Sequence, residues 1–360
     1  MLKTSFLLRM LLNRAPLLRI FLNRTPLLRM LPSPAPLLIL ALTLLGPPVR
    51  AQKGEPIPII FDTDMGPDYD DVGAITLLHA YADSGKCKIL ATMASDRYSN
   101  VAAVLNVFNT YFHRPGIPIG VPGGNAPDIR DEQHWSDTII ANYPHKINKN
   151  TDANNAVPLY RKILAAQPDH SVVIVTVGFQ TNLADLLETN PDKNSPLDGL
   201  QLVKKKVKLL VCMAGSFPRG KEFNITSDIS AALSVSKNWP TPIIYSGFEI
   251  GSRIKTGLAL IGNPAIRNSP VKDVFRIGIR HSSEDTQGRM SWDETAVFVA
   301  INGPAPWYTL RRGRMHIDTY GADTWEDSTD ERARHAYLVE ALPAATVQKE
   351  IDRLIQHQPR

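Results

Sequence analysis

Cysteine is scarce in this chain, whose 360 residues include two, Cys87 and Cys212. Two cysteines cannot form the dense disulfide framework that stabilises small secreted scaffolds. Each lies in an apolar segment that is typical of a core strand, so we expect two buried free thiols. The fold must therefore be stabilised by its hydrophobic core, for which the chain is long enough.

Acidic residues are absent from the first 51 positions, which carry seven lysines and arginines. Removing those seven from the 40 basic residues of the whole chain leaves 33 against 35 acidic ones, so residues 52–360 have a formal charge of −2. The sequence pI of about 9.1 is thus a property of the N-terminal segment and does not argue for nucleic-acid binding. At 43% hydrophobic and 21% charged residues, the composition is that of a soluble globular protein.

Residues 1–51 are predicted to be a segment separate from the rest of the chain. A positive region is followed by ten mostly apolar residues, LLILALTLLG (37–46), and by small residues up to Ala51. This order is typical of a secretory signal cleaved after Ala51, which predicts a secreted or periplasmic protein. The apolar run is too short for a membrane span, so we expect no stable membrane association after cleavage. An uncleaved anchor or a start codon placed too early are the alternatives, because the segment opens with a proline-ended repeat (LLRMLLNRAP, LLRIFLNRTP, LLRMLPSPAP).

Residues 52–360 are predicted to form one catalytic domain, because no linker rich in proline, glycine or serine divides them. Near-continuous apolar runs alternate with helical patterns, which predicts an α/β fold: a mixed, mainly parallel β-sheet flanked by helices on both faces. The polar stretch 122–155 is expected to be a long surface excursion, and segments 331–342 and 346–357 complete the chain. The expected strands are 57–61, 88–94, 117–121, 171–177, 207–213 and 242–245, and the expected helices are 71–82, 101–112, 156–166, 183–188, 229–237 and 295–301.

The first expected strand opens into an unusually acidic turn. Residues 59–71 read IIFDTDMGPDYDD, which places five aspartates within ten positions. At close range in a partly buried site these carboxylates would repel one another strongly. A hard divalent cation with oxygen ligands would remove the conflict. Because ligands of such sheets bind at the carboxyl ends of the strands, the turn predicts a metal site there. The five are Asp62, Asp64, Asp68, Asp70 and Asp71.

This turn resembles the DTDxGxDxDD signature of the inosine–uridine-preferring nucleoside hydrolases. Three later segments resemble further motifs of that family, in the same order: VTVGFQTNL (175–183), MAGSFPRGKEFNITSD (213–228) and WDETA (292–296). Four motifs in order between residues 59 and 301 are a specific signal, whereas each alone would be weak. The resemblance implies a mixed, mainly parallel sheet wrapped by helices, which agrees with the fold expected from the hydrophobic pattern.

The resemblance also implies a set of site residues. A calcium ion would be bound by the carboxylates of Asp64, Asp71 and Asp293 and by the backbone carbonyl of Val177. The 2′- and 3′-hydroxyls of a ribose would complete its coordination. Asp64 would also accept the proton of the attacking water. The residues expected to hydrogen-bond the ribose are Asp70, Asp96, Glu222 and Asn224.

The position before the last metal-binding aspartate departs from the commonest family pattern. Many members carry a histidine there to protonate the departing base, whereas this chain has Trp292. Purine-preferring members also carry tryptophan and stack the base on it, which implies a catalytic role for Trp292. Trp135, in the polar stretch, is the candidate for a second stacking ring. Packing roles for both tryptophans are the alternatives, and His134, His145 and His281 are alternative proton donors.

The resemblance therefore implies a calcium-dependent hydrolase that splits the N-glycosidic bond of ribonucleosides, with a preference for purines, into free base and ribose. Its partner would be the small-molecule nucleoside, and family members are commonly homodimers or homotetramers. Three alternatives are weighed against it. An EF-hand-like module would need glycine and glutamate at other positions of the loop. An aspartyl-phosphate phosphatase would need a threonine or valine where Gly66 stands. A non-catalytic nucleoside- or sugar-binding protein on the same fold, or a hydrolase of another ribosyl compound, is the closest rival.

Overall fold

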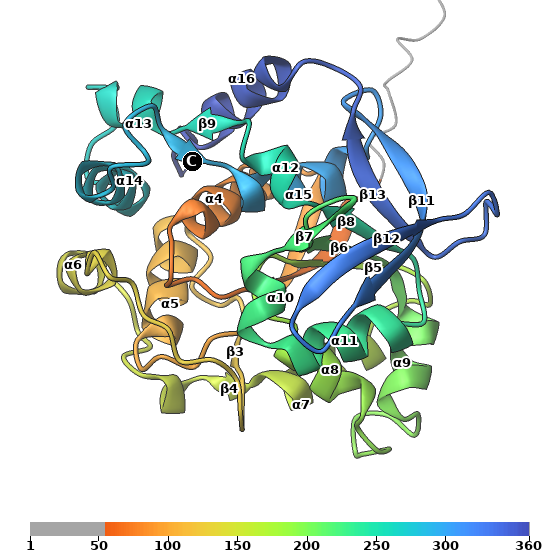
Figure 1. Ribbon diagram of the computed structural model, residues 1–360. Coiled ribbons are helices and arrows are strands. Elements are labelled where there is room, and N and C mark those ends of the chain that lie inside the picture. Colours follow the sequence, from red (N-terminus) through yellow and green to blue (C-terminus); the bar gives the residue numbers. More distant parts are fainter. Residues whose placement is uncertain (1–54, 360) are drawn as a thin grey trace, which may run out of the picture. The chain divides into compact units, whose positions relative to one another are not determined.

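The computed structural model describes residues 55–359 (Figure 1). The predictions made for residues 1–51, a repeat and a secretory signal, lie outside the described residues. Residues Gly54–Arg360 belong to one compact unit. Within the described part, no helix is both long and apolar enough to cross a membrane.

An 11-stranded sheet organises this unit, with strand order β4-β3-β2-β1-β5-β6-β8-β13-β11-β12-β7. All neighbours from β4 to β13 pair in parallel, and the pairs beyond β13 are antiparallel. The prediction of a mixed, mainly parallel sheet is confirmed. The strands of the parallel part are β1 (Ile57–Thr63), β2 (Cys87–Ala94), β3 (Ile119–Val121), β4 (Asn154–Asn155), β5 (Val172–Thr176), β6 (Val207–Met213), β8 (Ile243–Ser246) and β13 (His335–Glu340).

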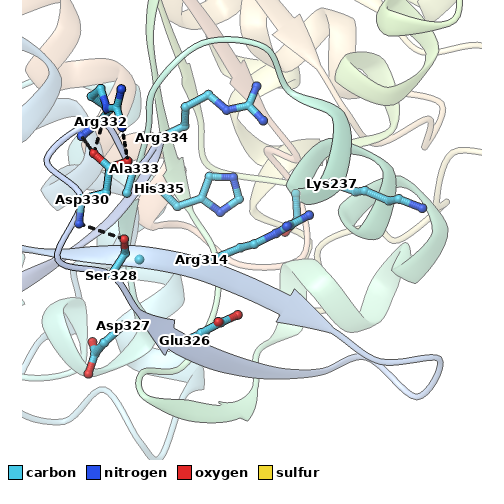
Figure 2. A pocket seen from close by; sticks show the side chains of 12 residues that line it. Lys237, Arg314, Glu326, Asp327, Ser328, Asp330, Arg332, Ala333, Arg334 and His335 are labelled. Atoms are coloured by element: carbon cyan, nitrogen blue, oxygen red, sulfur yellow. Dashed lines mark hydrogen bonds and ion pairs between the residues drawn. The ribbon is translucent and has the colours of Figure 1, made fainter.

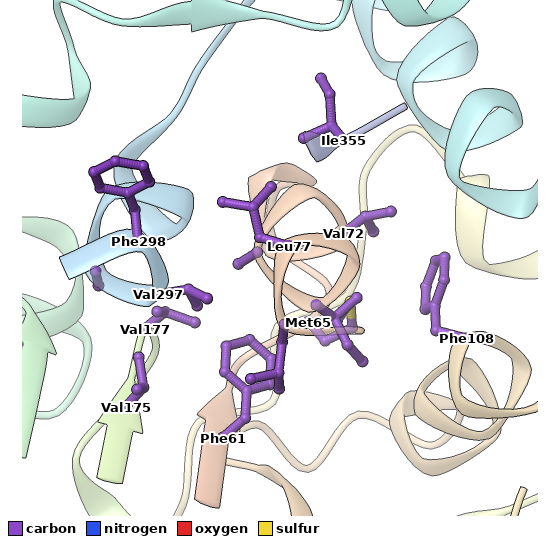
Figure 3. Close-up of a cluster of buried hydrophobic side chains, with 14 of the residues drawn as sticks. Phe61, Met65, Val72, Leu77, Phe108, Val175, Val177, Val297, Phe298 and Ile355 are labelled. Atoms are coloured by element: carbon purple, nitrogen blue, oxygen red, sulfur yellow. The ribbon is translucent and has the colours of Figure 1, made fainter. Parts of the chain in front are cut away.

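The central strands are buried on both faces, because successive side chains point to opposite sides of a sheet. Ile59 and Phe61 of β1 join one hydrophobic cluster, whereas Ile60 joins the other. Figure 3 shows Phe61 and Val175 of neighbouring strands packing in the first cluster with side chains from the covering helices. That face is covered by α4 (Asp70–Asp83), α5 (Val101–Tyr111), α14 (Pro270–His281), α15 (Trp292–Asn302) and α16 (Ala344–Leu354), and the other by α7 (Ala156–Ala165), α8 (Thr181–Leu187), α9 (Gly199–Lys206) and α11 (Ile229–Asn238).

The antiparallel edge was not anticipated from the sequence. Strands β11 (Tyr308–Ile317) and β12 (Ala322–Asp327) form a hairpin that extends the sheet beyond β13 (Figure 1). Strand β7 (Arg219–Lys221) pairs with β12 at the end of the sheet. The hairpin alternates buried and exposed residues only in part, because several arginines and acidic residues interrupt the pattern. A sequence pattern with so many charges favours a loop over a strand.

The stretch 122–155 is less exposed than expected. It contains helix α6 (Trp135–Asn142) and ends in β4, and Trp135 and Ile139 are buried in the first hydrophobic cluster. The prediction of a surface excursion is therefore corrected for its central part. Elsewhere the two cysteines are free and buried, as predicted. The smaller elements of the described part are η2 (Asn150–Asp152), α10 (Phe223–Ser227), α12 (Phe248–Gly251), β9 (Lys255–Thr256), α13 (Leu258–Gly262) and β10 (Arg289–Met290).

Candidate active site

A cavity of about 230 Å³ lies where several parallel strands end. It gathers side chains from distant parts of the sequence, beginning in the acidic turn after β1 and ending in the first turn of α15. Seven residues that the sequence analysis assigned to the site line it. Its lining residues are Asp64, Asp68, Asp70, Val177, Met213, Glu222, Phe223, Asn224, Phe248, Arg289, Trp292 and Asp293.

The turn after β1 is fixed by hydrogen bonds to its own residues. The N–H of Met65 donates to the hydroxyl oxygen of Thr63 at 3.1 Å and to Oδ1 of Asp71 at 3.2 Å. The Thr63 hydroxyl donates to the same Asp71 oxygen. Asp71 stands in the first turn of α4, where a carboxylate is also favoured by the helix dipole. These bonds fold the turn so that Asp64 faces the cavity while Asp71 lies buried beside it.

Asp62 points away from the cavity and supports the turn from within. Its carboxylate accepts the Tyr160 hydroxyl at 2.6 Å and the Asn182 amide at 3.1 Å. Burial raises its pKa to about 7. This position agrees with a structural role for Asp62.

Several buried carboxylates at the site have no cationic side chain as partner within residues 55–359, and those of Asp64, Asp71 and Asp293 are among them. Oδ2 of Asp71 is buried and accepts no hydrogen bond there. Burial, followed by the charges of neighbouring aspartates, raises the pKa of Asp64 and of Asp293 well above its usual range. Burial likewise raises the pKa of Asp71 to about 6. A bound cation would oppose each of these shifts, because it stabilises the ionised carboxylates.

Arg289 neutralises the other two acids of the turn. Its guanidinium lies 2.5 Å from Oδ2 of Asp68 and 2.6 Å from Oδ1 of Asp70, and its Nε donates to the same Asp70 oxygen at 2.9 Å. Oδ2 of Asp70 accepts the N–H groups of Trp292 and Asp293 at 3.1 and 3.2 Å. Both oxygens of Asp70 are thus engaged inside the protein, and the carboxylate satisfies two N–H groups at the start of α15.

The site fits a hard divalent cation. Carboxylate oxygens of Asp68, Asp70 and Asp293 lie within 4.8 Å of one another. Two of these acids already share Arg289, so the greater need for positive charge falls on Asp293 together with Asp64 and Asp71. The donors are all oxygens, which suits a metal of the magnesium or calcium type rather than zinc or copper.

Glu222 and Asn224 connect the ends of β5 and β6 at the site. The Asn224 amide donates to the backbone carbonyls of Val177 at 2.9 Å and Met213 at 3.2 Å. The Val177 carbonyl keeps a second lone pair for another partner. Glu222 caps α10 by accepting the N–H of Asn224 at 2.7 Å, and burial raises its pKa to about 7. Both side chains therefore have fixed orientations at the cavity wall.

An aromatic rim surrounds part of the cavity. Trp292 donates its indole N–H to the Phe248 carbonyl at 2.8 Å, and the two rings lie 5.2 Å apart at 31°. The Arg289 guanidinium lies 5.1 Å from the Trp292 ring centroid, so part of that ring is already in contact with protein. Phe223 and Phe248 line the same cavity with 49% and 46% of their surface exposed. The sequence analysis assigned no role to either phenylalanine, although Phe223 lies inside the third motif.

Two predicted site residues lie elsewhere. Trp135 is fully buried at the start of α6 and packs in the hydrophobic core, so it presents no ring to the cavity and the prediction of a second stacking ring there is corrected. Asp96 is buried close to Asp64 but does not line the cavity. Its two oxygens accept the N–H groups of Tyr98 at 2.7 Å and Ile129 at 3.0 Å, which fixes the loop after β2. The candidate proton donors His134, His145 and His281 do not line the cavity either.

An α/β sheet with a carboxylate-rich cavity at its strand ends is typical of metal-assisted hydrolases and of ligand-binding proteins. Comparison with known proteins decides between these two classes. The family model for the inosine-uridine preferring nucleoside hydrolases matches residues 59–353, and the chain belongs to this family. It is therefore a hydrolase acting on the N-glycosidic bond of ribonucleosides. Membership excludes the EF-hand and phosphatase alternatives and favours an enzyme over a binding protein.

Relatives of known name span nearly the same length. The pyrimidine-specific ribonucleoside hydrolase RihA of Salmonella enteritidis PT4 is 30% identical over 321 residues, which cover 82% of this chain and 94% of that protein. The RihA of Escherichia coli SMS-3-5 is 24% identical with the same coverage. Among solved structures, the purine-preferring ribonucleoside hydrolase from Gardnerella vaginalis has a TM-score of 0.63 at 18% identity and covers 83% of this chain and 99% of its own. The effector protein XOO4466 has a TM-score of 0.64 at 14% identity, covering 90% and 98%.

The role of Arg289 can be tested by Arg289→Met, which keeps an unbranched apolar stem and removes the charged guanidinium. Asp70 would then be buried without a cation, so we expect the free energy of unfolding to fall by at least about 2 kcal/mol. Chemical denaturation in the presence of a chelator measures it. Arg276→Met removes an exposed pair with Asp273 (2.8 Å) and should cost less than about 1 kcal/mol. Equal losses in the two variants would contradict the assignment.

Proposed function

We propose that this protein hydrolyses purine ribonucleosides in a calcium-dependent reaction that releases the free base and ribose. The observation that carries the proposal is the group of three buried carboxylates, Asp64, Asp71 and Asp293, none of which has a cationic partner within residues 55–359. Asp64, Asp293 and Val177 line the cavity and Asp71 is buried beside it, so the three carboxylates and the Val177 carbonyl together offer oxygen donors only. Calcium accepts such sets with irregular geometry.

Bound calcium would orient the ribose hydroxyls and lower the pKa of an attacking water. Asp64 lines the cavity without a cationic partner in the described residues, so its carboxylate is placed to accept the proton of that water. We assign the hydrogen bonds to the ribose to Glu222 and Asn224, because both side chains line the cavity. The acidic wall favours the positive charge that develops on the ribose as the glycosidic bond breaks.

A preference for purines is supported by the aromatic rim of Phe223, Phe248 and Trp292. A two-ring base offers a larger flat surface to aromatic side chains than a one-ring base does. The two exposed phenylalanines take the place that the sequence analysis gave to Trp135. Pyrimidine nucleosides are the second candidate substrates, because the curated relatives are named pyrimidine-specific.

Export and self-association complete the proposal. The signal-like pattern in residues 1–51 supports a secreted or periplasmic enzyme whose leader is cleaved after Ala51. A homodimer or homotetramer is proposed from the resemblance to the family.

Asp64→Asn tests the catalytic step. We expect ribose release from inosine to fall at least about a hundredfold, because the general base is lost. The fold should remain, since the change removes a buried charge that its neighbours repel. Asp128→Asn, at an exposed acid that pairs with Arg97 at 3.6 Å, is the control and should keep full activity. Undiminished ribose release by Asp64→Asn would remove Asp64 from the mechanism.

Calcium should stabilise the protein in a pH-dependent manner. Burial raises the pKa of Asp71 to about 6, and burial with the charges of neighbouring aspartates raises the pKa of Asp64 and of Asp293 well above the usual value for unfolded chains. The metal-free fold therefore holds protons that the unfolded chain lacks, and its stability falls as pH rises from about 4 to beyond about 6. Calcium requires ionised ligands, so its stabilisation grows over the same interval.

Thermal unfolding with calcium and with chelator measures this effect. The gain in Tm should be several degrees near pH 8, corresponding to about 2.7 kcal/mol at a hundredfold excess over Kd, and absent near pH 5. Asp293→Asn should abolish the gain at every pH, because it removes a ligand. An equal gain at both pH values would rule out these carboxylates as the calcium ligands.

Phe248→Ala tests the purine preference. The variant removes an exposed ring of the rim, so kcat/KM for inosine should fall about tenfold while that for uridine changes less than about threefold. Leu258→Ala is the control, because it removes an exposed apolar side chain that does not line the cavity. Equal losses on both nucleosides, or a wild-type enzyme that favours uridine, would contradict the preference.

A further inference from the structure

A second cleft, of about 390 Å³, lies at the antiparallel side of the sheet (Figure 2). It is bordered by the end of α11, by β11 and β12, and by the segment that leads into β13. None of its lining residues lines the active-site cavity. We refer to it as the Arg314 cleft. Its titratable lining residues are Lys237, Arg314, Glu326, Asp327, Asp330, Arg332, Arg334 and His335.

Two of the three acids of the Arg314 cleft, Asp327 and Asp330, are paired with arginines, and Glu326 lies beside a histidine. The arginine-paired carboxylates therefore leave little negative charge to balance the remaining cations. The pairs are Asp330 with Arg332 at 3.0 Å, Asp327 with Arg311 at 2.7 Å and Glu326 with His316 at 2.7 Å.

Three cations of the cleft, Lys237, Arg314 and Arg334, have no acidic partner within residues 55–359. Arg334 donates one hydrogen bond to the Trp239 carbonyl at 3.1 Å. Figure 2 shows the side chains of Arg334 and Arg314 on either side of the His335 ring, whereas Lys237 extends away from it. Two guanidinium groups thus flank one imidazole with no anion to share. Such an arrangement favours an anion bound between them.

His335 supplies a directed donor to the same place. The residue is 5% exposed, and its Nδ1 accepts the N–H of Met315 at 3.3 Å. Burial and the nearby Arg334 and Arg314 lower its pKa to about 4, so the neutral ring carries its proton on Nε2. No partner for Nε2 is found in the described part of the chain. Nε2 is not fully enclosed, and His335 lines the cleft, so a ligand or a water there can accept its hydrogen bond.

A smaller hollow of about 260 Å³ adjoins the cleft and shares Ser236, Lys237 and Arg314 with it. Its other lining residues are mostly apolar: Leu233, Met315 and Ile317, with His316. An anionic group between the arginines could therefore extend an organic substituent over an apolar surface. Phosphate alone would use only the first of the two spaces.

We propose that the Arg314 cleft binds a small phosphate monoester. The phosphoryl oxygens accept hydrogen bonds from Arg314, Arg334 and Nε2 of His335, and the organic group lies against Leu233 and Ile317. Guanidinium groups match the geometry of phosphate oxygens and form charge-assisted hydrogen bonds with them. The site is separate from the nucleoside cavity and does not depend on the proposed reaction.

Calorimetric titration of the full chain with phenyl phosphate and with inorganic phosphate tests this proposal. A chelator is present throughout, so that no metal ion can attract phosphate to the active-site cavity. Both probes should bind, and phenyl phosphate should bind several-fold more tightly because its ring covers apolar surface. Equal affinities would limit the site to the phosphate group and overturn the part assigned to the apolar hollow. No binding of either probe would overturn the proposal.

Arg314→Met and Arg334→Met should each weaken binding of phenyl phosphate at least about tenfold. Both positions are exposed, and two variants are used so that misfolding of one does not decide the result. Thermal unfolding checks that each variant is folded. Arg280→Met is the matched control, because Arg280 is an exposed arginine of α14 outside the cleft, and its affinity should equal that of the wild type. Loss of binding in Arg289→Met, with binding retained in Arg314→Met, would place the phosphate in the active-site cavity and contradict the assignment.

Discussion

The structure of the site depends on how the negative charge buried behind β1 is balanced. Five aspartates in one turn cannot all be ionised in a buried environment without positive charge close by. The protein itself balances part of this charge, because Arg289 forms ion pairs with both Asp68 and Asp70. Asp62 is held away from the cavity by Tyr160 and Asn182. Asp64 and Asp71, together with Asp293, have no basic partner in the described residues, which favours a metal ion beside them. The turn is thus divided between acids that the protein balances itself and acids that need a cation from outside.

Close backbone approach makes this arrangement possible. A Cβ added to Gly178, just after β5, would lie 2.4 Å from the Asp64 nitrogen, so any larger residue would separate the second motif from the acidic turn. A Cβ at Gly251 would lie 2.3 Å from the Cα of Trp292. The segment after β5 therefore meets the acidic turn, and the end of α12 meets the start of α15, at distances that only glycine permits. The geometry of the site therefore depends on these two glycines as well as on the acids that line the cavity.

The rule that ligands bind at the carboxyl ends of parallel strands located the acidic turn that carries Asp64. Val177 and Glu222 came from the resemblance to the family, and the structure brings both to the same cavity. Neither line of reasoning could find Arg289. This residue lies 219 positions after Asp70 and 221 positions after Asp68, in a segment without a periodic pattern. Trp135 was misplaced for the opposite reason: its polar neighbours suggested exposure, whereas tertiary packing buries its ring completely. Local composition reports the average environment of a segment and not the direction of one side chain.

The antiparallel hairpin that the sequence concealed also supports the catalytic motif. Asp323 of β12 accepts the N–H of Ser216 at 3.1 Å, and β12 pairs with β7 directly before Glu222. Gly215, in the same loop, donates its N–H to Glu222 at 3.3 Å. The loop between β6 and β7 is therefore held at both ends, by the parallel sheet and by the hairpin. Glu222 accepts a hydrogen bond from this loop and lines the active-site cavity. The antiparallel edge of the sheet, which also carries the Arg314 cleft, therefore helps to fix one wall of that cavity.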